Sequence, residues 1–459
     1  MTDVKQLSPV ADADLKATLR KVLWRLMPFL VLAHAIAGID RLNISFAKLR
    51  MAEDIVMSDA AYGLGAGVFY LGYILFEIPS NLLLQRIGAR ATLTRIMLLW
   101  GVITVATAFV RTPAQLVVSR FLLGVAEAGF FPGVILYLTY WFPAAFRGRV
   151  TAVFLMAGIF AGVLSGPLAG WIMTGLHGWG GFHRWQALFV LEGIPAVLLG
   201  LFAWFRLSDT PATASWLNSE ERLRLASALA ADSPRQASQG RLRDVLRDRR
   251  VYIAGLVYFC IYCGVNTTGY WMPTLIRGLG VEDLKTIGIL TSVPFVIALV
   301  GMYVLGRSSD RRMERRWHVA LPMLLSGFCF LFLGFVPQHA PLALALMSVG
   351  AAAGMCAIPL FWTIPPAFLA TANAAAGIAL ISCMGNLAGV VSQAGVGAIK
   401  SLTGNLYVAF DAIALVLVLG AAVLLSLVPA RLLQERKPIV QRRDEVGTAS
   451  PMASAEVGS

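Results

Sequence analysis

The sequence predicts an all-α membrane protein whose twelve transmembrane helices form two halves of six. Hydrophobic residues make up 58% of the 459 residues and charged residues only 14%, against about 45–50% and about 25% in soluble globular chains. Apolar stretches of about 20 residues, the length that crosses a bilayer, recur along the chain. A polar, basic segment separates them into two groups of six. This composition excludes an ordinary soluble enzyme, a disordered chain and a nucleic-acid binder.

Twelve apolar stretches are expected to cross the membrane. In order, they occupy residues 22–46, 60–85, 92–110, 114–141, 148–172, 184–207, 251–277, 285–306, 317–336, 340–362, 373–400 and 404–428. The segment before them is polar and has no apolar core or cleavage site, so we expect no cleaved secretory signal. The predicted units are a cytoplasmic N-terminal segment (1–21), an N-terminal six-helix half (22–207), a cytoplasmic linker (208–250), a C-terminal six-helix half (251–428) and a disordered cytoplasmic tail (429–459).

The basic residues predict the orientation of the chain. With both termini in the cytoplasm, 29 of the 38 Lys and Arg residues fall on the cytoplasmic side and seven on the outer side. Cytoplasmic loops of helical membrane proteins carry such an excess. The net charge of +13 is therefore explained by anionic lipid headgroups rather than by nucleic acid. The remaining two, Arg41 and Arg120, lie inside the membrane.

Two features support a duplicated arrangement joined by a linker. LLLQRIGAR (82–90) and GRSSDRRMERR (306–316) are short basic turns at corresponding places in the two halves. The linker contains a helical stretch, SEERLRLASALAAD (219–232), which Ser219 is expected to cap. Paired halves are a common transporter architecture, with the substrate site between them near mid-membrane.

The five cysteines all lie in apolar stretches. Cys260 and Cys263 have CxxC spacing, but no second pair of ligands accompanies them, so buried thiols are favoured over a zinc or redox site. No metal or organic cofactor is expected. No catalytic or nucleotide-binding motif indicates an enzyme or an ATP-driven pump.

Charged residues inside the predicted spans are functional candidates, because each costs about 2.5–3.5 kcal/mol in hydrocarbon. Arg120 and Glu127 are seven residues apart, close to two helical turns, so both lie on one face of the fourth span. Asp40 and Arg41 lie on the first span at a depth similar to that of Arg120. The complete set is Asp40, Arg41, Glu77, Arg120, Glu127, Glu192 and Asp411.

These charges suggest a mechanism if the first and fourth spans face a common cavity. Protonation of Asp40 and Glu127 would leave the guanidinium groups of Arg41 and Arg120 without counter-ions. Arginine matches a carboxylate bidentately, so the two groups would then attract an anionic substrate. Proton binding and anion binding would thereby be coupled. The alternative is that the four charges merely pair and hold the helices together.

The other titratable groups in the spans receive a structural interpretation. Glu77, which precedes Pro79 near the inner end of the second span, is expected to pair with cytoplasmic arginines. Glu192 and Asp411 are isolated and are interpreted as interhelical or structural groups. His34 could relay protons, but a packed, neutral ring is favoured.

Four segments carry a resemblance to a known family: IDRLNISFA (39–47), GYILFEIPSNLLLQRIGAR (72–90), SRFLLGVAEAGFFPGVILYLTYWFP (119–143) and RGR (147–149). They resemble the anion:cation symporter family of the major facilitator superfamily. The segments EIPSNLLL and AEAGFFPG are similar to those of its bacterial tartrate- and phthalate-type members. The resemblance covers nearly all of the chain and is strongest in the N-terminal half.

The resemblance implies the major facilitator fold and a carrier that imports organic anions with protons by alternating access. It assigns proton coupling to Asp40 and Glu127 and substrate binding to Arg41 and Arg120. A further set of residues matches the family's substrate-lining positions, the last three more loosely: Tyr73, Asn266, Trp362 and Asn386. Those three could instead form interhelical hydrogen bonds. Additional lining candidates are Tyr258, Tyr262 and Phe361.

One position departs from the superfamily pattern. The cytoplasmic turn after the second helix normally carries an Asp, and here the residue is Gln85. The matching turn of the second half keeps Asp310, followed by Arg311 and Arg312. The departure weakens one cytoplasmic contact and leaves the central charges unaffected.

The sequence therefore predicts a proton-coupled symporter for a small organic carboxylate, such as a tartrate-, phthalate- or sugar-acid-like anion. We expect a monomer in a bacterial inner membrane, whose partners are the anion, protons and lipid. The first alternative is a proton-antiport exporter of drugs or metabolites, because glycines at 158, 162, 166 and 170 partly resemble an antiporter motif; close helix packing explains them equally well. A receptor or membrane enzyme is the second alternative, and no large soluble domain supports it.

Overall fold

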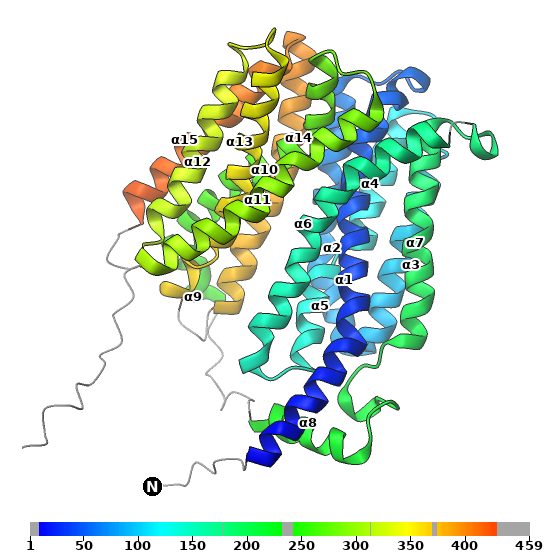
Figure 1. The fold of residues 1–459 in the computed structure, drawn as a ribbon, viewed down its shortest axis with the longest axis vertical. Helices are drawn as coiled ribbons and strands as arrows, with labels where there is room; N and C mark the ends of the chain where they lie inside the picture. Colours follow the sequence, from blue (N-terminus) through cyan, green and yellow to red (C-terminus); the bar gives the residue numbers. More distant parts are fainter. Residues whose placement is uncertain (1–8, 177, 232–241, 313, 370–373, 429–459) are drawn as a thin grey trace, which may run out of the picture.

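The computed structural model describes residues 9–176, 178–231, 242–312, 314–369 and 374–428. Within them it contains twelve helical spans that are long and apolar enough to cross a membrane. They form two bundles joined by a linker segment (Figure 1). This confirms the predicted fold class of twelve helices in two halves.

The N-terminal half contains seven α-helices that make six spans. They are α1 (Pro9–Asp54), α2 (Asp59–Ile87), α3 (Ala89–Thr107), α4 (Pro113–Glu127), α5 (Phe130–Thr139), α6 (Ala144–Gly175) and α7 (Arg184–Arg206). Helices α4 and α5 together form the fourth span, Pro113–Thr139.

The C-terminal half contains one α-helix for each span. These are α10 (Arg249–Gly278), α11 (Leu284–Arg312), α12 (Arg316–Leu333), α13 (Ala340–Phe361), α14 (Ala374–Thr403) and α15 (Leu406–Leu427). The linker contributes the short helices α8 (Ser219–Ala231) and α9 (Leu242–Arg247).

The first helix is much longer than its apolar stretch. It runs for 46 residues from Pro9, whereas hydropathy identifies only the part from 22 to 46. Its polar first turns pack on α8 through ion pairs of Lys21 with Glu221 at 2.8 Å and of Arg224 with Asp14 at 3.3 Å. The linker helix is therefore attached to the N-terminal half.

The linker helix confirms the predicted helical stretch, but its cap lies one residue earlier than expected. The Asn218 side chain accepts from the Glu221 amide at 2.7 Å, and the Glu221 carboxylate accepts from the Asn218 amide at 2.9 Å. This reciprocal pair is a capping box. Asn218, not Ser219, is therefore the capping residue.

The fourth span is interrupted between α4 and α5. Gly129 has φ of 84°, which a residue with a side chain rarely adopts. A Cβ at this position would lie 2.6 Å from the Ser80 hydroxyl oxygen. Pro132 also lacks the amide that a continuous helix would use there. Glu127 is consequently the last residue of α4.

The two halves pack closely at one end, where glycines allow backbone contact. A Cβ on Gly63 of α2 would lie 2.3 Å from the Gln393 carbonyl oxygen of α14, and one on Gly166 of α6 would lie 2.2 Å from the Gly288 carbonyl oxygen of α11. In Figure 1 the bundles converge at the top and diverge toward α8 and α9. The converging end is the one that the basic residues assign to the outside.

Charged side chains join the halves at the same end. Asp59 of α2 pairs with Lys48 of α1 at 2.6 Å and with Lys400 of α14 at 3.1 Å. The Lys48 ammonium lies 3.9 Å from the centre of the Trp271 ring. We call Lys48, Asp59, Trp271 and Lys400 the outer cluster. It connects the halves where the structure is closed.

Candidate functional site

An ion pair between the first and fourth spans lies at the centre of the N-terminal half. Both Arg41 Nη2 and Arg41 Nε approach Glu127 Oε1, at 2.6 and 2.7 Å. The Glu127 side chain is 1% exposed and that of Arg41 is 31% exposed. The pair therefore has one fully buried member, Glu127, and one partly exposed member, Arg41.

The ends of α4 position this acid and the second arginine. Pro113 occupies the first helical turn, and the Thr112 hydroxyl accepts from the Gln115 amide at 3.2 Å, which begins the helix. The helix then ends at the Gly129 break. Arg120 and Glu127 therefore sit two turns apart on one short helix, as the spacing predicts.

Arg120 is a buried cation without a hydrogen-bonding partner in the described part of the chain. It is 1% exposed, and its Nε, Nη1 and Nη2 atoms are all unpaired there. Its guanidinium carbon lies 5.1 Å from the centre of the Phe69 ring, and that of Arg41 lies 5.5 Å from the same centre. Both arginines thus neighbour one aromatic ring of α2. We call Arg41, Arg120 and Glu127 the central charge cluster.

Asp40 points away from this cluster. Successive helical residues are about 100° apart, so Asp40 and Arg41 face different sides of α1. Asp40 Oδ2 accepts from the Thr104 hydroxyl of α3 at 2.6 Å, and Oδ1 accepts from the Asn43 amide group at 2.7 Å. It is 1% exposed. Asp40 therefore lies in the interior of the N-terminal half, within electrostatic range of Glu127 and Arg120.

Tyr73 and Asn266 connect the central charges to the C-terminal half. The guanidinium carbon of Arg41 lies 5.2 Å from the centre of the Tyr73 ring. Asn266 of α10 accepts from the Tyr70 hydroxyl of α2 at 2.7 Å. Sequence reasoning missed Tyr70, whose position three residues before Tyr73 on the same helix was an available signal.

Aromatic residues of the C-terminal half surround Trp362. The Trp362 Nε1 donates to the Tyr258 hydroxyl at 3.1 Å. The Tyr258 ring lies 4.5 Å from Tyr262 and 4.9 Å from Phe361, measured between centres. Asn386 of α14 is half-buried. Its neighbour Gly385 lies against this group, since a Cβ there would be 2.4 Å from the Tyr258 ring.

Three other titratable residues of the membrane spans, Glu77, His34 and Asp411, differ in their contacts. Glu77 forms no ion pair with a cytoplasmic arginine among the described residues, contrary to expectation, and interacts electrostatically with Arg41 instead. The His34 ring is packed against Phe154, 4.5 Å between centres, in agreement with the packed interpretation. Asp411 of α15 is half-buried with no hydrogen-bond or ion-pair partner in the described ranges.

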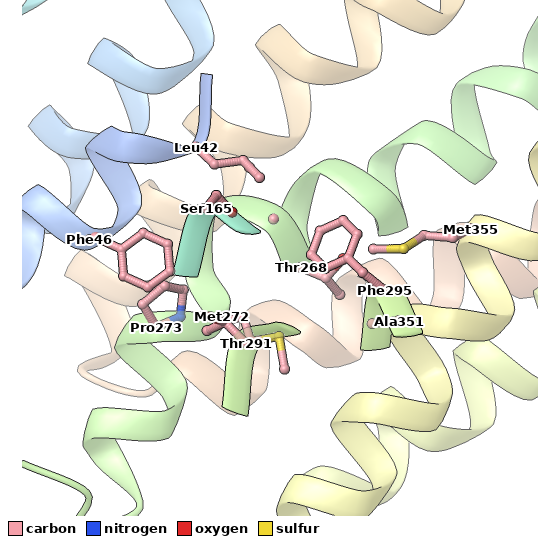
Figure 2. A pocket seen from close by; sticks show the side chains of 11 residues that line it. Leu42, Phe46, Ser165, Thr268, Met272, Pro273, Thr291, Phe295, Ala351 and Met355 are labelled. Carbon is pink, nitrogen blue, oxygen red and sulfur yellow. The ribbon is translucent and has the colours of Figure 1, made fainter. Parts of the chain in front are cut away.

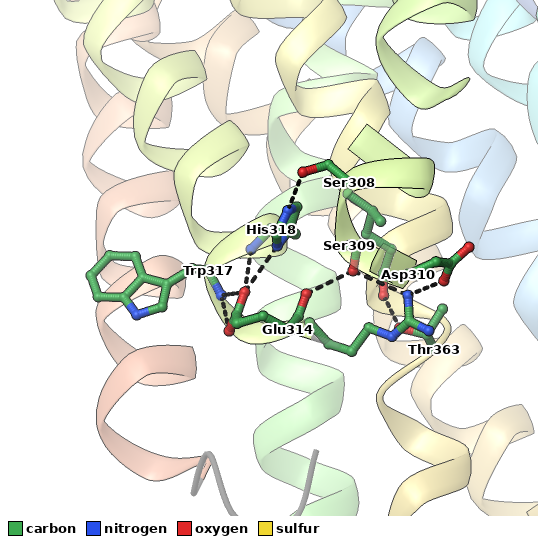
Figure 3. A network of polar contacts seen from close by, with 9 residues as sticks. Ser308, Ser309, Asp310, Glu314, Trp317, His318 and Thr363 are labelled. Carbon is green, nitrogen blue, oxygen red and sulfur yellow. Dashed lines mark hydrogen bonds and ion pairs between the residues drawn. The ribbon is translucent and has the colours of Figure 1, made fainter. Parts of the chain in front are cut away.

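The two cytoplasmic turns are held by different acids. Gln85 is exposed, and the turn after α2 is held instead by Asp209, which accepts from the Arg90 amide at 2.9 Å. In the second half, Asp310 pairs with Arg315 at 2.5 Å. Beside it, Glu314 accepts from the Trp317 amide and contacts His318 (Figure 3). Partial burial acts to raise the pKa of Glu314, but these contacts with Trp317 and His318 hold it below its ordinary value.

A separate small pocket lies between the halves on the outer side of Arg41. Figure 2 shows side chains from both halves around it, among them Leu42, Phe46 and Phe295. Its free volume of about 20 Å³ admits about one water molecule. Its lining is mainly apolar and lacks the central charges, so it is part of the closed outer side and not the candidate site.

A carrier fold with charged groups at mid-membrane defines the class of protein: a polytopic helical transporter. Residues 30–393 match the family described as the Major Facilitator Superfamily, and the chain belongs to it. It is therefore a multi-pass membrane protein and not an enzyme. The inward-open xylose transporter XylE from E. coli has the same fold, with a TM-score of 0.71 at 18% identity, over 89% of this chain and 96% of that one.

Curated relatives cover nearly the whole chain. It is 42% identical to "Putative metabolite transport protein NicT" of Pseudomonas putida, over 92% of this chain and 96% of that protein. It is 41% identical to a "Putative tartrate transporter" of Agrobacterium vitis, over 91% and 96%. It is 39% identical to a "Quinolone resistance transporter" of Acinetobacter baumannii, over 93% and 98%.

Proposed function

We propose that this protein imports a small organic carboxylate together with protons by alternating access. The observation that carries the proposal is the central charge cluster. Arg41 is neutralised by Glu127, whereas the neighbouring Arg120 is buried without a hydrogen-bonding partner in the described chain. A buried cation of this kind is costly unless an anion reaches it. A carboxylate would supply that anion.

Protonation of Glu127 would make Arg41 available to the same substrate. An ionised Glu127 competes with any carboxylate for the Arg41 guanidinium, whose Nε and Nη2 both approach Glu127 Oε1. A protonated Glu127 is a weaker partner, so the guanidinium can bind the substrate bidentately. Proton binding and substrate binding therefore support each other, which is the thermodynamic requirement for symport.

Asp40 is proposed as the second proton carrier, acting from behind α1. Its two oxygens accept hydrogen bonds from Thr104 and Asn43, which hold the carboxyl in place behind α1. Its electrostatic contact with Glu127 and Arg120 links its charge to the substrate site without direct contact. Protonation there would add positive charge to the site as the substrate arrives.

The substrate class follows from the two arginines and their aromatic neighbours. Two guanidinium groups suit a dicarboxylate, and the relative named a tartrate transporter is consistent with one. We propose that Tyr73, Asn266, Trp362 and Asn386 line the substrate site. Their hydroxyl, amide and indole groups would bind hydroxyls or an aromatic ring of the anion.

Uptake into proteoliposomes under an imposed pH gradient tests the proposal. The panel is tartrate, phthalate, sugar acids and hydroxyphenylacetate. We expect at least one anion to accumulate when the outer solution is acidified, in wild-type protein and in the matched variant Asp411→Asn. If no anion responds and a quinolone is instead extruded against the gradient, the antiport alternative that the relative's name raises would replace this proposal.

A further inference from the structure

Glu192 is a buried acid that the proposed transport mechanism does not use. It lies on α7, is 5% exposed, and neither of its carboxyl oxygens has a hydrogen-bond partner in the described part of the chain. Helix α7 packs on α3, α1 and α6. A carboxylate in such a place would have lost its hydration without replacement, which is strongly unfavourable.

Among the residues that the structure describes, no Lys, Arg or His pairs with the Glu192 carboxyl. Its charged neighbour is Asp40 of α1, which is also acidic. On α3, the Thr104 hydroxyl donates to Asp40. The charged residues of α3 and α6 all lie in the first two turns of their helices, at the cytoplasmic end: Arg90, Arg95, Arg147 and Arg149. An ionised Glu192 would therefore face a like charge and no counter-ion.

Asn43 supplies the missing partner for a protonated acid. Its amide nitrogen donates to Asp40 at 2.7 Å, while its Oδ1 is buried and accepts no hydrogen bond. The Asn43 side chain lies beside the Glu192 carboxyl, although no hydrogen bond joins the two residues in the described part of the chain; an Asn43 N–H turned toward Glu192 would favour the ionised acid, and Asn43 Oδ1 the protonated one. A carboxylic acid has one O–H to donate, and an amide oxygen is a suitable acceptor.

We propose that Glu192 is a proton-binding site that stays protonated and positions Asn43 for Asp40. The Glu192 O–H donates to Asn43 Oδ1, which directs the Asn43 amide group at Asp40. Asp40 exchanges its proton during transport, and Glu192 keeps its own. The role in transport rests on the proposed proton coupling, whereas the protonation of Glu192 does not.

Infrared difference spectroscopy of the full-length protein in lipid tests the protonation directly. We expect the carbonyl band of a protonated carboxylic acid to persist at alkaline pH in wild-type protein and in Asp411→Asn. Glu192→Gln should remove that band, whereas Asp40→Asn should leave it. A spectrum that is unchanged by Glu192→Gln would overturn the proposal, even if the wild-type protein transports no carboxylate.

The pH profile of uptake tests the positioning role. Glu192→Gln retains a donor for Asn43, so we expect uptake within about twofold of wild type and an unchanged profile. Glu192→Leu leaves Asn43 Oδ1 unpaired, so we expect uptake to fall about tenfold and its pH profile to shift. Asn43→Ala should do the same, and the double variant should be no worse than either. Loss of uptake in Glu192→Gln would mean that Glu192 must release its proton, which refutes this role.

Discussion

Replacing Glu127 by glutamine tests the central charge cluster most directly. The substitution keeps the size of the side chain and removes its charge, so Arg41 loses its counter-ion at 2.6 Å. We expect Glu127→Gln to bind substrate with little dependence on pH and to lose accumulation driven by a pH gradient. Exchange of substrate between the two sides should survive, because it needs no net proton movement.

The magnitude follows from the geometry of the ion pair. Two unit charges about 4 Å apart interact by about 4 kcal/mol at an effective dielectric constant of about 20. Arg41 is 31% exposed, so screening reduces this figure, and we take about half. A competition of about 2 kcal/mol corresponds to roughly a 30-fold change in the substrate Kd between protonated and ionised Glu127.

The assay is substrate binding to purified protein across a pH series, paired with counterflow in proteoliposomes. Wild-type protein and Asp411→Asn should lose roughly 30-fold in affinity as Glu127 ionises, whereas Glu127→Gln should lose less than about threefold. If Glu127→Gln keeps the wild-type pH dependence and still accumulates substrate, the competition between Glu127 and substrate for Arg41 does not exist.

Three further outcomes are expected. Arg120→Lys keeps the charge but loses bidentate geometry, so the substrate Kd should rise at least about tenfold; an unchanged Kd would remove Arg120 from the site. Asp59→Asn leaves the buried Lys48 without its carboxylate, so the free energy of unfolding should fall by about 3 kcal/mol and the melting temperature by several degrees. An unchanged melting temperature would contradict the role of the outer cluster. Gly129→Ala forces a Cβ against Ser80 at a φ of 84°, so folded yield should drop by an amount equivalent to about 1–3 kcal/mol, which size-exclusion chromatography would measure.

The membrane spans could be predicted from the sequence because apolar length is a local property. The placement of Arg120 and Glu127 on one face also follows from helical periodicity. The break after Glu127 had a readable signal in Gly129 and Pro132, yet hydropathy alone joins α4 and α5 into one span. Hydropathy also missed the polar beginning of α1, because this part is helical through its packing against α8.

Contacts between distant segments could not be predicted in this way. Whether Arg41 or its neighbour Asp40 faces Glu127 depends on how α1 is rotated against α4. Adjacent charges on a helix point in directions about 100° apart, so a single cavity could not receive both Asp40 and Arg41. Contacts of Tyr70 with Asn266 and of Asp209 with the Arg90 amide join residues more than a hundred positions apart. Only the tertiary arrangement of the helices specifies them.

The outer cluster has a consequence for how anions approach from outside. Asp59 is shared between Lys48 of the N-terminal half and Lys400 of the C-terminal half. Separation of the halves at this end would leave Lys400 without that carboxylate, and Arg277 would likewise part from Glu53. The C-terminal side of the open mouth would then carry the unpaired charges of Lys400 and Arg277, which the acids of the N-terminal half neutralise in the closed state. These unpaired charges would draw carboxylates toward the entrance while it is open, which would make capture faster at low ionic strength.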